Sequence, residues 1–184
     1  MAKGRELKGR IKSVENTRKI TRTMEMVATS KMKRAQDRVA AARPYAQALR
    51  DVIGSLYSPE LAEQFPLLRQ PAQMKRVAVI ALTANRGLAG AFNANLIKEA
   101  RTTILGLEAK GVAVDLHAIG KKGLGYFRYV GREAVSSRTD ISDRPTAVNA
   151  AEIVNDLTEA FARGEIDAVY IIYQIGRASC RERV

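Results

Sequence analysis

The chain has 184 residues, of which 46% are apolar and 5% aromatic, with no Trp. This length suits one domain of ordinary size with an extended element attached. No run of eighteen apolar residues appears, and the charged N-terminus lacks the apolar stretch of a secretory signal, so the sequence predicts neither feature. One Cys and one His exclude an intrachain disulfide framework and disfavour a structural zinc site, which needs four ligands.

The positive charge is unevenly placed along the chain. Residues 1–50 hold fourteen Lys and Arg against four Asp and Glu, a net charge of +10, whereas residues 51–174 hold fourteen of each. Residues 175–184 add a net +2. This pattern predicts a neutral globular part with a basic rod, and a basic rod indicates an acidic partner: nucleic acid, an anionic membrane, or acidic lobes of another protein.

The rod is predicted as a helix from Met1 to about Tyr57, which is roughly 80 Å at 1.5 Å per residue. Pro44 should kink it or mark a joint, because proline removes a backbone donor. Apolar residues recur at steps of three, four and seven, the spacing of a coiled-coil seam. A helix this long needs a second helix along it to be stable. The seam contains Leu7, Ile11, Val14, Met32 and Val39.

Residues 58–75 contain three prolines and are predicted to be a linker with one short helical turn. Beyond them, apolar runs alternate with amphipathic stretches, which predicts a mostly parallel sheet in a three-layer α/β domain. The predicted strands are 76–82, 112–119, 167–173 and an edge strand at 133–137. The predicted helices are 94–110 and 146–163, with a short helix or turn at 120–131.

The domain shows weak candidates for chemistry. The turn TANRGLAGAFN follows a strand, where phosphate loops are found, but Gly87 and Gly90 do not complete a nucleotide-binding pattern. The run GKKGLG, with Gly120, Gly123 and Gly125, falls short in the same way. A tight turn is the favoured interpretation, and His117 is read as a core or surface histidine. The sequence predicts no active site.

The basic helix allows several kinds of partner. Nucleic-acid binding favours aromatic residues among the basic ones, yet residues 1–44 contain none. A membrane-surface helix favours bulky Leu, Phe or Trp, whereas this stripe is rich in Ala and Met. Contact with protein, one face against a helix and the other against acidic surfaces, is therefore favoured over a merely solvated charged face.

The segment RELKGRIKSVENTRKITRTMEMVATSKMKRAQ resembles the N-terminal helix of the gamma-subunit family of F-type ATP synthases, and the joint ARPYA follows it. The turn TANRGLAGAFN resembles the family's DRGLCG turn. Asn85 stands where the family usually has Asp, and Ala89 where it often has Cys, which excludes redox chemistry at the turn. The resemblance extends from Met1 to about Gln174.

This resemblance implies a non-catalytic rotor subunit. The family forms a central stalk, an antiparallel coiled coil of its two terminal helices, inside a ring of alpha and beta subunits. Its Rossmann-like domain lies beside the epsilon subunit and the c-ring, on the cytoplasmic side of the bacterial inner membrane, and proton-driven rotation drives ATP synthesis at the beta subunits. Nucleotide and Mg belong to the alpha and beta subunits, so no cofactor, metal or nucleic acid is expected here.

The matched motif also implies which residues contact the acidic lobes of the beta subunits. They lie in the middle of the predicted helix and are basic or flexible and apolar. These residues are Lys19, Ile20, Arg22, Met24, Val27, Lys31 and Lys33.

The last ten residues, IGRASCRERV, break the strand pattern and carry the sole cysteine, Cys180. They read as the translation of a common sequencing adapter, which predicts native sequence only through Gln174 and a missing C-terminal helix. The predicted parts are thus a stalk helix (1–57), a linker (58–75), an α/β domain (76–174) and a non-native tail (175–184). Two alternatives stay open: a nucleic-acid-binding α/β protein with a basic arm, and a nucleotide-dependent enzyme that uses the Gly87–Gly90 turn.

Overall fold

The computed structural model describes residues 2–56, 58–175 and 178–183. The chain divides into two compact units, Met1–Tyr57 and Ser58–Val184. Met1 and Tyr57, the predicted ends of the first helix, lie outside the described residues. Among the described residues, no helix combines the length and apolar character needed to cross a membrane.

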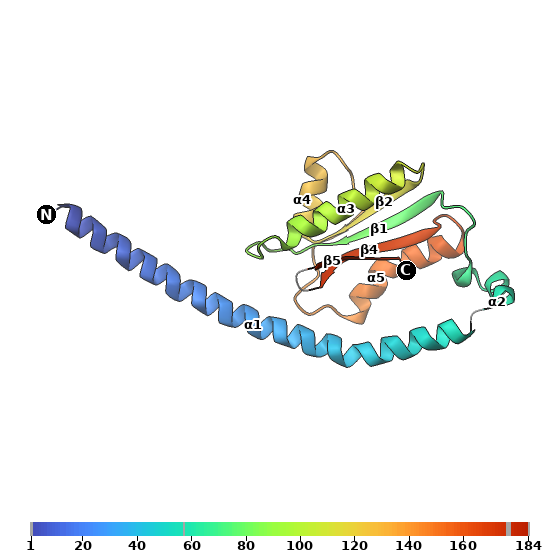
Figure 1. Cartoon of the computed structure of the whole chain (residues 1–184), viewed down its shortest axis with the longest axis horizontal. Helices are drawn as coiled ribbons and strands as arrows, with labels where there is room; N and C mark the ends of the chain where they lie inside the picture. The colour runs from blue at the N-terminus through green and yellow to red at the C-terminus, as the bar shows by residue number, and fades with distance from the viewer. Residues whose placement is uncertain (1, 57, 176–177, 184) are drawn as a thin grey trace. The chain divides into compact units, whose positions relative to one another are not determined.

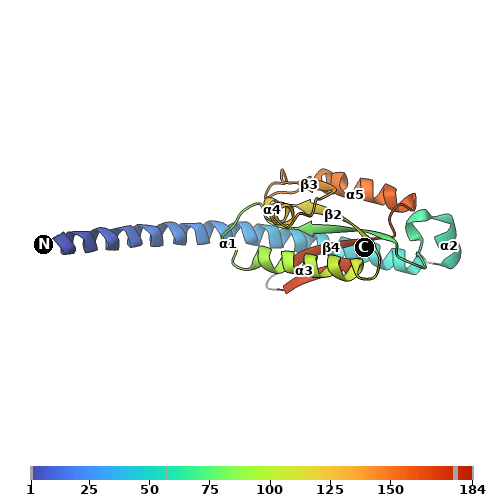
Figure 2. The same ribbon diagram turned by 90° about the horizontal axis from the view of Figure 1, so that it is seen from above.

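The first unit is one helix, α1 (Ala2–Leu56), 55 residues long. Its central run lacks Gly and Pro and is rich in Ala, Arg, Lys and Met, which favour helix. Pro44 lies inside it without ending it. Figure 1 shows α1 continuous and bent toward its C-terminal part, whereas it looks straight from above in Figure 2, so the bend lies in one plane. Pro44, which lies inside this helix, lacks a backbone donor, and proline is a common cause of helix bending.

The second unit begins with two short helices, α2 (Pro59–Gln64) and the 3₁₀ turn η1 (Pro66–Leu68). The Ser58 side chain accepts a hydrogen bond from the Leu61 amide and so caps α2. The Arg69 guanidinium lies 4.5 Å from the centre of the Phe161 ring, and its Nε donates to the Phe161 carbonyl at 3.1 Å. The segment predicted as a linker is therefore fastened to the domain that follows it.

The domain contains a five-stranded sheet in the order β3-β2-β1-β4-β5. All neighbours pair in parallel except β4 and β5, which are antiparallel. The strands are β1 (Arg76–Leu82), β2 (Ala113–Ile119), β3 (Ser136–Arg138), β4 (Ala168–Ile175) and β5 (Ala178–Arg183). The prediction of a long helix followed by a mostly parallel α/β domain is confirmed.

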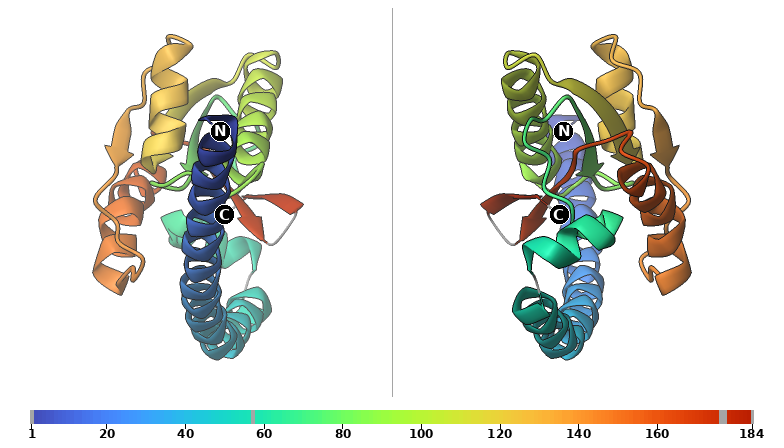
Figure 3. Two further views of the ribbon diagram at one scale, coloured as in Figure 1. Left: turned by 90° about the vertical axis from the view of Figure 1, so that its left-hand side faces the viewer. Right: turned by 90° about the vertical axis from the view of Figure 1, so that its right-hand side faces the viewer.

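Helices cover both faces of the sheet, as the end-on views in Figure 3 show. On one face α3 (Phe92–Glu108) and α4 (Lys121–Tyr129) bury a core that contains Leu96, Ile104 and Phe127. On the other face α5 (Ala147–Ala162) buries Leu157. A continuously apolar strand such as β1 must be covered by helices on both faces of the sheet, because its side chains point alternately to the two faces.

One prediction about the last ten residues, 175–184, is wrong. Residues 178–183 do not break the strand pattern: they form β5 beside β4, with Cys180 opposite Tyr173. An antiparallel neighbour needs only backbone donors and acceptors, which side-chain patterning does not reveal. Residues 176, 177 and 184 lie outside the described residues. That the tail is non-native stays a prediction.

Candidate interaction surfaces

The first candidate surface is the whole of α1. Every side chain from residue 4 to residue 56 is exposed, including those of the predicted seam. Leu7, Val14 and Met32 expose 59, 69 and 55% of their surface, and Ile11 and Val39 are similar. Exposed apolar residues that recur in this way along a helix are typical of a contact surface, whereas single exposed apolar residues are common on any protein.

The seven predicted contact residues all lie on α1, but helical spacing divides them into two ridges. Residues three or four apart share a face, so Ile20, Met24, Val27 and Lys31 form one ridge. The second ridge contains Lys19, Arg22 and Lys33. It follows two shallow grooves of the helix surface, one lined by Lys19 and Arg22 and the next by Arg22 and Lys33. The seven predicted contact residues therefore do not share one face of the helix.

The polar side chains of α1 differ in whether they already have a partner within the described part of the chain. The hydroxyls of Thr17, Thr21 and Thr23 each donate at 3.0 Å to a carbonyl of the preceding turn, so these donors are already occupied. Lys19 and Lys33, in contrast, have no ion pair within the described part of the chain. The helix thus offers unpaired positive charge rather than directional hydroxyl contacts.

The glycine-containing turn after β1 contains two residues with left-handed backbone. Leu88 has a left-handed backbone (φ 60°) and is 94% exposed, and Gly90 also has positive φ (55°). The side chain of Asn93 accepts a hydrogen bond from the Ala84 amide at 2.9 Å and so holds the base of the turn. The turn joins β1 to α3, as the favoured interpretation expected.

The second glycine run packs α4 against the end of β1. At Gly120 (φ 95°), a Cβ atom would lie 2.1 Å from the Thr83 carbonyl oxygen, so only glycine fits. The first amides of α4 are also occupied. Those of Lys121, Lys122 and Gly123 donate to Asn85 Oδ1, the Ala84 carbonyl and Thr83 Oγ1. The donors at the start of α4 are therefore already paired with groups at the end of β1.

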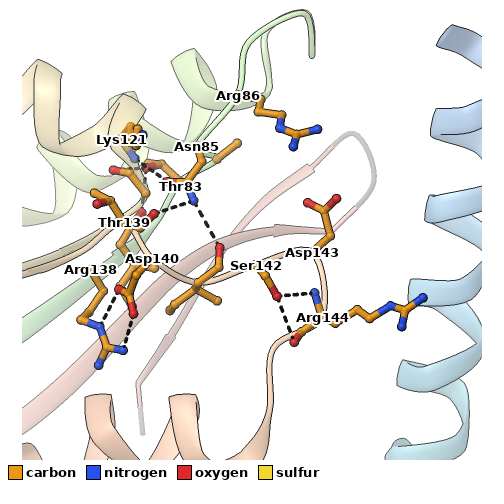
Figure 4. A pocket seen from close by; sticks show the side chains of 14 residues that line it. Thr83, Asn85, Arg86, Lys121, Arg138, Thr139, Asp140, Ser142, Asp143 and Arg144 are labelled. Carbon is orange, nitrogen blue, oxygen red and sulfur yellow. Dashed lines mark hydrogen bonds and ion pairs between the residues drawn. The ribbon is translucent and has the colours of Figure 1, made fainter.

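A second candidate surface lies where β1, β2 and β3 end. An open pocket of about 800 Å³ is lined by Thr83–Arg86, Ile119–Lys121 and Arg138–Arg144. Figure 4 shows the Asn85 side chain joining these loops: its Nδ2 donates to the Thr139 and Ile141 carbonyls at 3.0 and 3.3 Å. Sequence reasoning treated Asn85 only as a departure from the family pattern and missed this pocket, because its walls come from three distant segments.

Ionic contacts fix the wall of this pocket on the β3 side. Arg138 donates to both carboxylate oxygens of Asp140 at 2.8 Å and to Glu152 of α5 at 2.8 Å. The side-chain hydrogen bond from Arg138 lowers the pKa of Asp140 to about 2. Arg138 and Asp140 therefore neutralise each other at neutral pH.

His117 lies half-buried on β2, and its Nδ1 is 2.7 Å from the Ser136 hydroxyl on β3. Partial burial lowers its pKa, although the nearby Asp115 and Asp156 carboxylates act in the opposite direction. No group of three or more His, Cys, Asp or Glu side chains able to hold a metal occurs among the residues that the structure describes. His117 therefore links the neighbouring strands β2 and β3, which fits its interpretation as a core or surface histidine.

The comparisons with known proteins agree with one another. A family model described as ATP synthase matches residues 3–182. The ATP synthase gamma chain of Gemmatimonas aurantiaca is 68% identical over 173 residues, which cover 94% of this chain and 60% of the relative. The gamma chains of Leptospira biflexa and Stenotrophomonas maltophilia are 45 and 44% identical with the same coverage. The chain therefore spans about three fifths of the length of these relatives.

A solved structure shares the fold. The structure of the central stalk and c-ring of the Tetrahymena thermophila mitochondrial ATP synthase contains a chain that matches with a TM-score of 0.68 and 21% identity. The match covers 90% of this chain and 71% of that one, and at this identity it concerns the fold alone. From the match of the family model over nearly its whole length, the chain belongs to the ATP synthase family, and its relatives there are gamma chains.

Proposed function

We propose that the chain acts in the central stalk of an F-type ATP synthase, a rotor subunit that couples proton-driven rotation of a membrane ring to ATP synthesis at the beta subunits. The observation that carries this proposal is α1: a 55-residue helix, exposed along its length, with an apolar stripe and excess positive charge. It occurs in a chain 68% identical to a gamma chain.

The apolar stripe supports a second helix as the first partner. An isolated helix draws little stability from propensity alone, so Leu7, Ile11, Val14, Met32 and Val39 need an apolar neighbour. In this assignment residues 1–57 are one half of an antiparallel coiled coil. Residues 58–75 join it to the α/β domain.

The two ridges support contact with the beta subunits. A rod inside a ring is touched from several sides at once, which fits Lys19, Arg22 and Lys33 on one ridge and Ile20, Met24, Val27 and Lys31 on the other. Long basic side chains and methionine adapt to different neighbours, and positive charge complements acidic lobes. Such contacts transmit force without holding the rod at one angle.

The proposed partners are the alpha and beta subunits, the epsilon subunit and the c-ring. The chain itself is non-catalytic in this assignment, and nucleotide and Mg are bound by the alpha and beta subunits. It reaches the cytoplasmic side of the bacterial inner membrane only through the complex. The chain has no role with nucleic acid.

The test is reconstitution. The gene product that carries this chain is mixed with its alpha and beta subunits, and copurification and coupled ATPase activity are measured. We expect the three to copurify, and Arg22→Glu to reduce coupled activity severalfold, because it reverses a charge on the ridge that faces acidic lobes. The matched control is Arg101→Glu, an exposed cation of α3 that leaves α1 unchanged.

Three results would count against the stalk. The subunits could fail to copurify, or Arg22→Glu and Arg101→Glu could reduce activity equally. Salt-sensitive DNA binding that persists against an acidic competitor protein would instead favour a basic nucleic-acid-binding arm.

A further inference from the structure

The pocket at the ends of β1, β2 and β3 is not accounted for by the stalk assignment. All its lining residues belong to the second unit, and it is open to solvent. Its geometry is fixed in advance, because Asn85 bonds the loops after β1, β2 and β3 together and Arg138 joins one wall to α5. In open sheets with parallel strands, ligands bind outside the carboxyl ends of the strands, where the strand order reverses. This pocket lies at the carboxyl ends of β1, β2 and β3, beside the reversal between β1 and β4.

The pocket has a positive excess. Its lining includes four cations, Arg86, Lys121, Arg138 and Arg144, and two carboxylates, Asp140 and Asp143. Arg138 is used by Asp140 and by Glu152 of α5. For the side chains of Arg86, Lys121 and Arg144, no ionic partner occurs among the described residues. Cations without an ionic partner in the described part of the chain thus come from three separate loops that line one hollow, and they add to its positive potential.

We propose that this pocket binds the phosphate groups of a small molecule, with Arg86 and Lys121 as the main phosphate ligands and Arg144 at the rim. A volume of about 800 Å³ accommodates a ligand the size of a mononucleotide, since small-molecule pockets measure roughly 300–1,000 Å³. The guanidinium fork of Arg86 matches two phosphate oxygens, and Lys121 adds a point charge. Thr139 adds a hydroxyl to the wall, whereas the Ser142 hydroxyl is already bonded to the backbone of Arg144.

The site differs from a glycine-rich phosphate loop. The first amides of α4 already donate to Thr83, Ala84 and Asn85, and the glycines of the turn after β1 do not line the pocket. Side chains, not backbone amides, therefore supply the positive charge. Because these side chains are exposed, binding must weaken strongly as salt rises. Binding here is independent of the stalk assignment and adds no step to nucleotide chemistry.

The test is a titration of the chain, in low salt, with inorganic phosphate, pyrophosphate and ADP, followed by calorimetry. We expect saturable binding of pyrophosphate and ADP, and a loss of roughly tenfold or more in affinity for Arg86→Ala and for Lys121→Ala, as expected for a charge-assisted hydrogen bond. Equal affinity for pyrophosphate and ADP would show that the pocket recognises the phosphate groups alone, so that its ligand is an inorganic phosphate. Tighter binding of ADP identifies a nucleotide, whose nucleoside then fills the rest of the pocket.

The matched control is Arg101→Ala, which removes an exposed cation of α3 outside the pocket and should leave affinity unchanged. Circular-dichroism melts of all three variants should coincide, because none of these side chains has an ionic partner in the described part of the chain. The proposal is overturned if none of the three probes binds saturably in the millimolar range. It is equally overturned if Arg101→Ala weakens binding as much as the pocket variants, since the attraction is then non-specific.

Discussion

The hydroxyl of Thr83, at the end of β1, accepts a hydrogen bond from the Gly123 amide in α4 at 2.9 Å. The same hydroxyl donates to the Ile119 carbonyl at 2.8 Å, so Thr83 is fixed in orientation between two elements. A Cβ atom on Gly123 would lie 2.7 Å from Thr83 Cγ2. Glycine at 123 is therefore required by packing, and not by a ligand.

Gly123→Ala should destabilise the domain by about 1–3 kcal/mol, the usual cost of overpacking, because the short Thr83 side chain cannot move without losing both hydrogen bonds. Urea denaturation measures the change. Gly125→Ala is the matched control in the same helix: nothing lies within 4 Å of the added Cβ, so better helix propensity should leave stability equal or raise it by up to about 1 kcal/mol. Equal destabilisation of both variants would refute the packing explanation.

The contacts of Arg69 should be among the main ones that hold the segment before the domain against the end of α5. Its Nε donates to the Phe161 carbonyl, a second nitrogen donates to the Ile166 carbonyl, and Asp167 lies 3.6 Å away. Arg69→Met keeps an apolar stem but leaves these carbonyls without the donor, so we expect a loss of about 2 kcal/mol by urea denaturation. Limited proteolysis should then cut near η1 more readily.

The control for this change is Arg163→Met. Arg163 also forms ion pairs, with Glu159 and Glu165, but its side chain is 56% exposed. Exposed pairs contribute between zero and about 1 kcal/mol. A larger effect at Arg163 than at Arg69 would contradict the view that the Arg69 contacts secure the segment.

His117 should make stability depend on pH in a narrow window. Burial holds its pKa in the folded chain below the usual 6.5, so the unfolded chain binds more protons as the pH falls through 6.5. Stability is therefore greatest above this pH and decreases below it, until the folded form also becomes protonated. His117→Gln should remove the part of the slope that lies near and just below pH 6.5. Urea midpoints between pH 5 and 8 measure it, and an unchanged slope would exclude His117 as its source.

Helices and strands could be predicted from the sequence where the local run of residues alone determines them. The run RVAVIAL gives β1 at the predicted bounds, because a strand buried on both faces leaves an uninterrupted apolar pattern. The edge strand β3 begins three residues after its predicted start, since its pairing with His117–Ile119 of β2 sets its position. The pocket was missed for the same reason: Asn85, Lys121 and Thr139 are far apart in sequence and meet only through the sheet.

Asn85 should hold the loop after β3 in place. Its side chain accepts from the Lys121 amide at 3.0 Å and donates to the Thr139 and Ile141 carbonyls. Asn85→Ala leaves these groups unpaired in a partly buried site, so we expect a loss of about 1–3 kcal/mol and faster hydrogen exchange at the Lys121 amide. Asn95→Ala, an exposed residue on α3, is the control and should change neither quantity. If exchange at Lys121 stays slow in Asn85→Ala, another group holds the start of α4, and the pocket is less dependent on Asn85 than its three hydrogen bonds indicate.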